Sequence, residues 1–136
     1  MNSESGEARL YLFVYGTLRR AAHTRWSRFL AEKSSFEGLG RTRGELFHLD
    51  GYPGMVAARD DDSWVRGEVC LLEGPAVLAT LDAYEGCAPG DEKPYEFERE
   101  PVNVAMEDGR TLQAWAYFYR WGTEGRARIP SGDFFR

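Results

Sequence analysis

The sequence predicts an α+β fold, with a small, mostly antiparallel, barrel-like sheet of about six strands and two or more flanking helices. An unbroken apolar run over 11–15 is typical of a strand that is covered on both faces. Most predicted strands follow one another through connections too short for parallel crossovers. Asp108-Gly109 between two alternating apolar runs is a strong hairpin signal. Two further segments carry apolar residues at helical spacing.

Bulk properties indicate an ordinary globular protein. The chain of 136 residues is long enough for a core, and we expect a flexible tail over 1–8 followed by one domain over 9–136. No apolar run approaches the roughly 20 residues that span a bilayer, and the polar, acidic start argues against a secretory signal. A net charge of −5 disfavours nucleic-acid binding, and two cysteines make no disulfide framework. We therefore expect a cytoplasmic monomer or weak homodimer without nucleic-acid or membrane partners.

The first half of the chain is expected to alternate short strands with one helix. Apolar residues at i, i+3 and i+4 predict a helix within 23–32, capped by Thr24 or Ser27. A loop is expected over 34–40. Strands are then expected over 41–49, with a possible bulge at Gly44, and over 55–58.

The second half begins with a strand over 64–72. Pro75 stands at a plausible first helical position, apolar residues then follow at helical spacing, and Gly86 is a natural C-terminal stop. Strands over 95–106 and 111–121 form the predicted hairpin.

The strand over 11–15 ends at a turn that could bind an anion. Gly16 permits close approach of a ligand to the main chain, and the Thr17 hydroxyl can cap a turn or bind a ligand. Arg19 and Arg20 follow directly. Free backbone N–H groups near positive charge make a plausible carboxylate-binding nest, although an ordinary strand-to-loop turn also explains the pattern.

Glu85 is the second candidate. It is the last residue of the predicted helix, where unpaired carbonyls carry partial negative charge. This charge and partial burial should both raise its pKa, which suits a general acid and base near neutral pH. A solvated glutamate at the edge of a loop is the alternative, and Asp82, one turn earlier, could simply face solvent.

Several motifs resemble the γ-glutamylcyclotransferase-like family, in particular its bacterial γ-glutamylamine cyclotransferase-like branch. The matches cover nearly the whole chain in a preserved order. Two departures occur: Ala21-Ala22-His23 stands where relatives carry Gly and then Asn-His, and Arg99 follows Tyr95 at a spacing two residues longer than the family's. The matching segments are Tyr15-Gly16-Thr17-Leu18, Gly44-Glu45-Leu46-Phe47, Gly51-Tyr52-Pro53-Gly54, Gly67-Glu68-Val69, Leu81-Asp82-Ala83-Tyr84-Glu85-Gly86 and Ala116-Tyr117-Phe118-Tyr119.

The resemblance implies a function and a site. Tyr15, Gly16, Thr17 and Leu18 would hold the α-amino-acid end of a γ-glutamyl group, and Glu85 would be the catalytic acid and base. The substrate's own amine would attack its γ-carbonyl and release 5-oxoproline and an amine or amino acid, with no metal or cofactor. Independently, Tyr119 in the last strand could place its hydroxyl in the pocket, while core packing is the expectation for Tyr117.

Other readings stay open at this point. A non-catalytic small-molecule-binding domain on the same fold is the main alternative, and hydrolysis of an unrelated amide is a third. Cys87 has no histidine near it in sequence that could activate its thiol, and Cys70 is expected in the core. His23 and His48 show no metal-ligand spacing.

Overall fold

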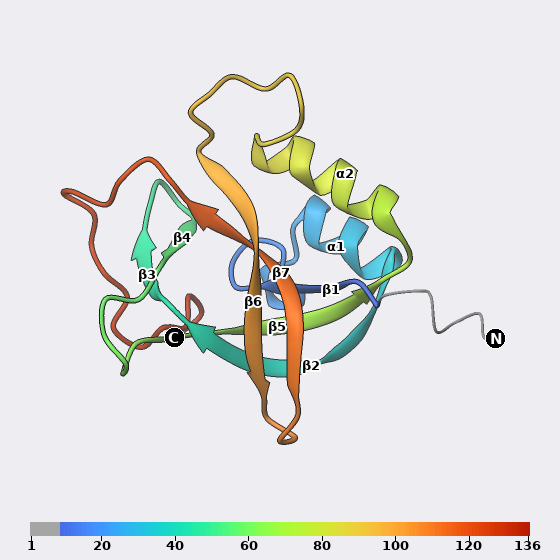
Figure 1. Cartoon of the computed structure of the whole chain (residues 1–136), viewed down its shortest axis with the longest axis horizontal. Coiled ribbons are helices and arrows are strands. Elements are labelled where there is room, and N and C mark those ends of the chain that lie inside the picture. Colours follow the sequence, from blue (N-terminus) through green and yellow to red (C-terminus); the bar gives the residue numbers. More distant parts are fainter. Residues whose placement is uncertain (1–8) are drawn as a thin grey trace.

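A five-stranded barrel forms the body of the molecule (Figure 1). The computed structural model describes residues 9–136, so the tail expected over 1–8 lies outside the described residues. Antiparallel pairing joins β1 to β5, β5 to β2, β2 to β6 and β6 to β7, and a parallel contact between β1 and β7 closes the ring. The barrel strands are β1 (Tyr11–Val14), β2 (Ser34–Arg43), β5 (Trp64–Leu72), β6 (Phe97–Met106) and β7 (Thr111–Tyr119).

Two short strands extend the sheet beyond the barrel. Strand β4 (Pro53–Val56) lies parallel to β7, and β3 (Glu45–His48) pairs with β4 in an antiparallel hairpin. The predicted mostly antiparallel, barrel-like sheet is therefore confirmed. The described residues form seven strands rather than about six.

The extra strand comes from the segment over 34–40, where the prediction of a loop was wrong. This polar, glycine-rich segment pairs with β5 from Ser34 onward, through a bulge between Phe36 and Gly38. A Cβ at Gly40 would stand 2.6 Å from the Val104 Cγ1 atom, so glycine there lets two barrel strands approach closely. The strand expected over 41–49 is divided at Gly44 between β2 and β3.

Both predicted helices are present. Helix α1 (Arg25–Glu32) begins at Thr24, whose hydroxyl accepts a hydrogen bond from the Ser27 N–H while the Ser27 hydroxyl accepts one from the Thr24 N–H. Helix α2 (Pro75–Glu85) has proline in its first turn and ends at Gly86, which has a φ of 83°. A short 3-10 turn, η2 (Arg20–Ala22), precedes α1. The two helices lie together on one side of the barrel (Figure 1).

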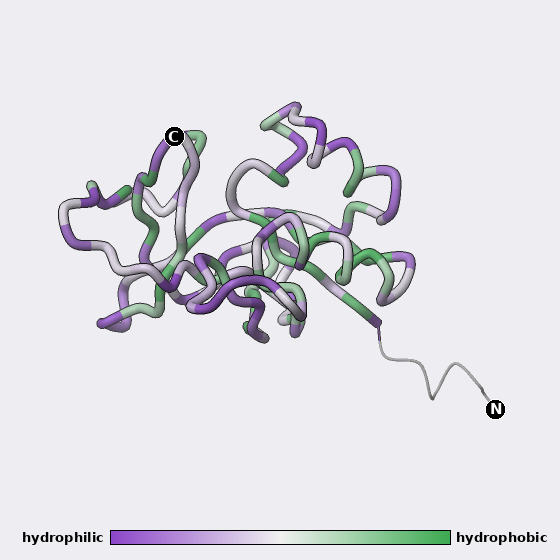
Figure 2. The backbone as a smooth tube through the Cα atoms, turned by 90° about the horizontal axis from the view of Figure 1, so that it is seen from above, coloured by the Kyte–Doolittle hydropathy of each residue, from purple (hydrophilic) through white to green (hydrophobic). Residues whose placement is uncertain are grey.

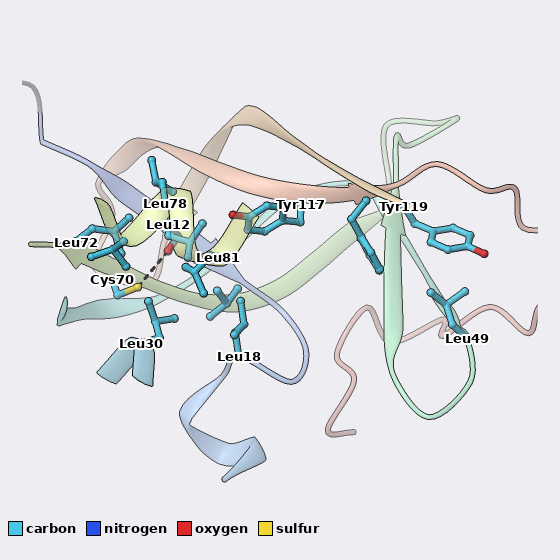
Figure 3. Close-up of a cluster of buried hydrophobic side chains, with 13 residues drawn as sticks. Leu12, Leu18, Leu30, Leu49, Cys70, Leu72, Leu78, Leu81, Tyr117 and Tyr119 are labelled. Carbon is cyan, nitrogen blue, oxygen red and sulfur yellow. Dashed lines mark hydrogen bonds between the residues drawn. The ribbon is translucent and has the colours of Figure 1, made fainter. Parts of the chain in front are cut away.

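The core has two parts because β1 is buried on both faces. Phe13 and Tyr15 belong to a cluster with residues of β5, β6 and β7, which places that cluster inside the barrel. Leu12 and Val14 belong to a second cluster, which includes Leu30 of α1 and the buried side of α2 (Figure 3). Hydrophilic and hydrophobic residues are interspersed along the described chain rather than gathered in one part of it, as Figure 2 shows. The predicted two-sided burial of β1 is confirmed.

Among the described residues, none of the helices combines the length and the apolar character needed to cross a bilayer.

Candidate active site

A cleft of about 290 Å³ opens where the loop after β1 meets the end of α2. The loop contributes Tyr15, Gly16, Thr17 and Leu18, and the helix contributes Glu85. The structure thus brings these five predicted site residues together. The remaining lining residues come from β1 and β7, from the turn before β4 and its first residue, from the last turn of α2 and from the start of β6: Phe13, Val14, Gly51, Tyr52, Pro53, Tyr84, Glu96, Phe97 and Tyr117.

Helix α2 ends directly after Glu85, at Gly86. Gly86 adopts a left-handed conformation that residues with a Cβ rarely adopt, and its N–H donates to the Ala83 carbonyl. The Cys87 N–H donates to the Asp82 carbonyl at 2.9 Å. These bonds satisfy carbonyls of the last turn, so Glu85 is the final helical residue, as predicted.

Asp82 ties the same helix end to the barrel. Its carboxylate accepts two hydrogen bonds from the Arg99 guanidinium, at 2.8 and 2.9 Å, and one from the Tyr117 hydroxyl at 2.7 Å. Burial opposes ionisation of Asp82, but these bonds outweigh it and hold its pKa below the usual value. Asp82 is thus an anchor with a side chain only 13% exposed, rather than a solvent-facing acid.

The carboxyl group of Glu85 is a weaker acid than that of an ordinary glutamate. Burial, followed by the charges of Glu96 and Asp82, raises its pKa from 4.5 to about 8. The predicted direction is confirmed, and its causes are desolvation and neighbouring carboxylates. Within residues 9–136 the Glu85 carboxyl makes no hydrogen bond, so its proton is free to exchange with a molecule in the cleft.

Glu96 is the second carboxylate of the cleft. It accepts a hydrogen bond from the Tyr52 hydroxyl, and burial together with this bond raises the Tyr52 pKa. No positively charged side chain lines the cleft among the described residues. The cleft therefore favours a cationic group, such as an ammonium, near its two glutamates.

The loop after β1 is fixed by Tyr15. Its buried hydroxyl donates to the Tyr117 carbonyl at 2.6 Å and accepts from the Met55 N–H at 3.1 Å, which joins β7 to β4. Burial raises the Tyr15 pKa far above its normal value, so the hydroxyl stays protonated. Tyr15 thus supports the loop and lines the cleft with its ring.

Gly16 allows the loop to pass tightly over β4. A Cβ at this position would stand 2.6 Å from the Pro53 Cγ atom. In the described part of the chain, the N–H groups of Gly16, Thr17 and Leu18 donate to no protein acceptor, whereas the Thr17 carbonyl accepts from the Thr24 hydroxyl at 2.7 Å. Three successive free amides remain available to an anion.

The structure corrects two expectations about the surroundings of the cleft. Arg19 pairs with Glu68 and Asp133, and the Arg20 guanidinium stacks 3.6 Å from the ring centroid of Phe36. The two arginines expected to bring positive charge to the loop amides therefore interact with other residues and do not line the cleft.

The second correction concerns β7. Tyr119 lies in the core outside the lining of the cleft, whereas Tyr117 lines it. Both residues share one face of the strand, as the alternation predicted, but Tyr119 lies two residues further along and packs near Leu49, while Tyr117 lies near Leu81 (Figure 3). The expected core packing of Tyr117 is confirmed, and Tyr117 lines the cleft as well, whereas Tyr119 belongs to the core alone.

Sequence reasoning missed Glu96, Tyr52 and Tyr117 as cleft residues. Tyr52 belongs to a matched family segment, so a signal existed. Glu96 stands in the polar stretch before β6 without any motif of its own. Its position depends on the path of the loop between α2 and β6, which spacing alone does not show.

The two cysteines carry no signature of a reactive thiol. Burial raises the pKa of Cys70 and of Cys87 to about 11 in each case, so both remain protonated near neutral pH. In the described ranges, no group of three or more His, Cys, Asp or Glu side chains is arranged to hold a metal ion.

Comparison with known proteins identifies the family. The model for "Gamma-glutamyl cyclotransferase, AIG2-like" matches residues 12–136. The chain belongs to this family. It is 28% identical over 110 residues to "Putative gamma-glutamylcyclotransferase MJ1514" from Methanocaldococcus jannaschii, a match covering 80% of this chain and 83% of that protein.

Solved structures of two similar proteins share the fold. The crystal structure of YkqA from Bacillus subtilis superposes with a TM-score of 0.69 at 28% identity, over 93% of this chain but only 39% of that longer protein. The solution structure of YtfP from Escherichia coli superposes with a TM-score of 0.63 at 28% identity, over 92% of this chain and 96% of that one.

Proposed function

We propose that this chain is an enzyme that cyclises a γ-glutamyl amine or γ-glutamyl amino acid to 5-oxoproline, with Glu85 as general acid and base. The observation that carries the proposal is the position of Glu85, a carboxyl with a pKa raised to about 8 and no hydrogen-bond partner among residues 9–136, in one cleft with three free loop amides. Membership of the γ-glutamyl cyclotransferase family supports the reaction class.

Binding follows the charges of the cleft. The free amides of Gly16, Thr17 and Leu18 suit the substrate's α-carboxylate or the oxyanion that forms during the reaction. Glu96, and Glu85 in its ionised form, attract the α-ammonium. The γ-glutamyl chain then folds back, so that its nitrogen lies near its own γ-carbonyl carbon.

The proton transfers balance without water. Ionised Glu85 takes one proton from the α-ammonium, and the amine nitrogen attacks the γ-carbonyl carbon to form the new C–N bond. The oxyanion collapses, the original C–N bond breaks, and Glu85 returns its proton to the departing nitrogen. The second proton lost by the attacking nitrogen ends on the released amine, which leaves as an ammonium ion.

A group with a pKa near the working pH suits both halves of this cycle. It accepts a proton from an ammonium more readily than a carboxylate of ordinary pKa, and it still returns that proton to the leaving nitrogen. Tyr15 supports the loop, while Asp82 and Arg99 hold the helix end, so these residues position the reacting groups.

The test is product analysis in ¹⁸O-labelled water with a panel of γ-glutamyl amino acids and γ-glutamyl alkylamines. The proposal predicts unlabelled 5-oxoproline in an amount equal to the released amine. Labelled glutamate would identify a hydrolase and contradict it. Thermal stabilisation by the same compounds without any product would favour the non-catalytic binding domain.

A further inference from the structure

A second cleft, of about 500 Å³, adjoins the candidate active site. It shares Tyr84, Glu85 and Glu96 with the first cleft, and its remaining walls are Gly86, residues 91–94 and Trp121. The loop between α2 and β6 that carries 91–94 arches out at the end of α2 in Figure 1. Because Glu85 lines both clefts, a substrate whose γ-glutamyl group contacts the loop after β1 has room for its leaving group in the second cleft, past Glu85.

The charges of the second cleft favour a cation. Its acidic side chains are Asp91, Glu92 and Glu96 in addition to Glu85, against the single ammonium of Lys93. That ammonium lies 5.7 Å from the centroid of the Tyr95 ring. The Glu92 carboxylate forms no hydrogen bond or ion pair within residues 9–136. The electrostatic free energy of an ammonium ion therefore decreases when it enters this cleft, and that of a carboxylate increases.

An exposed aromatic ring completes the cleft. Trp121 is 58% exposed, although large apolar side chains are usually more deeply buried. Its indole N–H donates to the Pro94 carbonyl at 3.0 Å, which fixes the ring against the loop. A ring held in this way can contact methylene groups, or a cation over its face.

The unpaired Glu85 carboxyl marks where the two clefts join. It lines both clefts and makes no hydrogen bond within residues 9–136, so it is available to a ligand at this point. Under the proposed function Glu85 returns its proton to the nitrogen of the scissile bond, which places that nitrogen of a γ-glutamyl compound at this junction. The part beyond it faces the acidic residues and Trp121.

Resting on the proposed function, we infer that the second cleft is a subsite for a leaving amine that carries a second ammonium group at a distance and no carboxylate. Glu92 and Trp121 are its specificity-determining residues. A γ-glutamyl α-amino acid would present its carboxylate to this acidic surface and is the poorer substrate.

Three γ-glutamyl compounds of equal chain length test the charge preference. They carry 1,5-diaminopentane, hexylamine or 6-aminohexanoate on the γ-carbonyl, so that five methylene groups separate the scissile nitrogen from an ammonium, a methyl or a carboxylate. We expect kcat/KM for the ammonium compound to exceed that for the methyl compound by about tenfold, with the carboxylate compound slowest. Added salt at about 0.3 M should reduce this ratio.

Two single substitutions localise the preference. Glu92→Gln should lower the ammonium-to-methyl ratio by about threefold or more. Glu107→Gln removes the same charge from the exposed β6–β7 turn and should leave the ratio unchanged. Equal losses in both variants, or equal kcat/KM for the three compounds in wild type, would overturn the inference while the proposed function stands.

A binding measurement separates this inference from the proposed function. The NMR resonance of the Trp121 indole N–H, assigned with Trp121→Phe, should shift with 1,5-diaminopentane and not with 6-aminohexanoate. A shift without 5-oxoproline from any compound would reject the proposed function and retain an amine-binding cleft. If the Trp121 resonance does not shift and the three compounds are turned over at equal rates, the subsite is rejected and the proposed function stands.

Discussion

The guanidinium of Arg99 on β6 holds both carboxylate oxygens of Asp82 on α2, three residues before Glu85. The same guanidinium lies 4.6 Å from the ring centroid of Trp115. This paired contact fixes the end of α2 against the barrel with a planar, two-bond geometry that a lysine does not reproduce. The position of Glu85 in the cleft depends on it.

Arg99→Met should therefore reduce both stability and activity. Asp82 would keep only its bond from Tyr117 and remain largely buried, at a cost of about 2 kcal/mol in the free energy of unfolding. Urea denaturation measures this loss. Arg120→Met, which removes exposed ion pairs to Glu98 and Glu100, is the control and should cost less than about 1 kcal/mol. Equal costs for the two variants would contradict the anchoring role.

The raised pKa of Glu85 predicts a pH-dependent stability penalty. Between pH 4.5 and about 8 the carboxyl is protonated in the folded chain and ionised in the unfolded one, so stability decreases as the pH rises through this window. Glu85→Gln should accordingly be more stable than wild type by up to about 4 kcal/mol near pH 8 and nearly equal to it near pH 4.5.

Denaturation curves at several pH values measure that difference. Glu107→Gln, at an exposed turn, is the matched control and should show no such trend. A Glu85→Gln effect of constant size across the pH range would show that Glu85 titrates normally.

Gly16→Ala should displace the loop that carries the free amides. Its Cβ would overlap the Pro53 ring, so we expect a cost of about 1–3 kcal/mol and a rise in KM for γ-glutamyl compounds. Gly74→Ala is a suitable control because a Cβ at Gly74 meets no atom within 4 Å and its φ of 178° suits any residue. Normal kinetics in Gly16→Ala would argue against a binding role for the loop.

The two tyrosines of β7 should differ in activity assays. Tyr117→Phe removes the hydrogen bond to Asp82 beside the cleft and should lower kcat/KM, with a loss of about 1 kcal/mol in stability. Tyr119→Phe alters a hydroxyl outside the cleft and should leave kcat/KM within about twofold of wild type. The reverse order of effects would restore Tyr119 as the substrate-binding residue.

Local signals in the sequence predicted much of this arrangement. Gly86 and the apolar spacing before it placed Glu85 at the end of α2, and the Asp108-Gly109 turn predicted the β6–β7 hairpin. Predictions were wrong where tertiary packing overrides local propensity: β2 begins in a polar, glycine-rich segment because glycine permits close strand contact. Glu96 and the direction of the two arginines depend on loop paths that spacing does not encode.

The most direct test of the central claim is the rate of 5-oxoproline release by wild type and Glu85→Gln across the pH range. The substitution keeps size and hydrogen-bonding capacity but removes the base. We predict a loss of about a hundredfold or more in the variant. The wild-type kcat/KM should rise with pH and level off near pH 8, as Glu85 ionises. An active variant, or a wild-type profile without this rise, would contradict the role of Glu85 as the proton carrier.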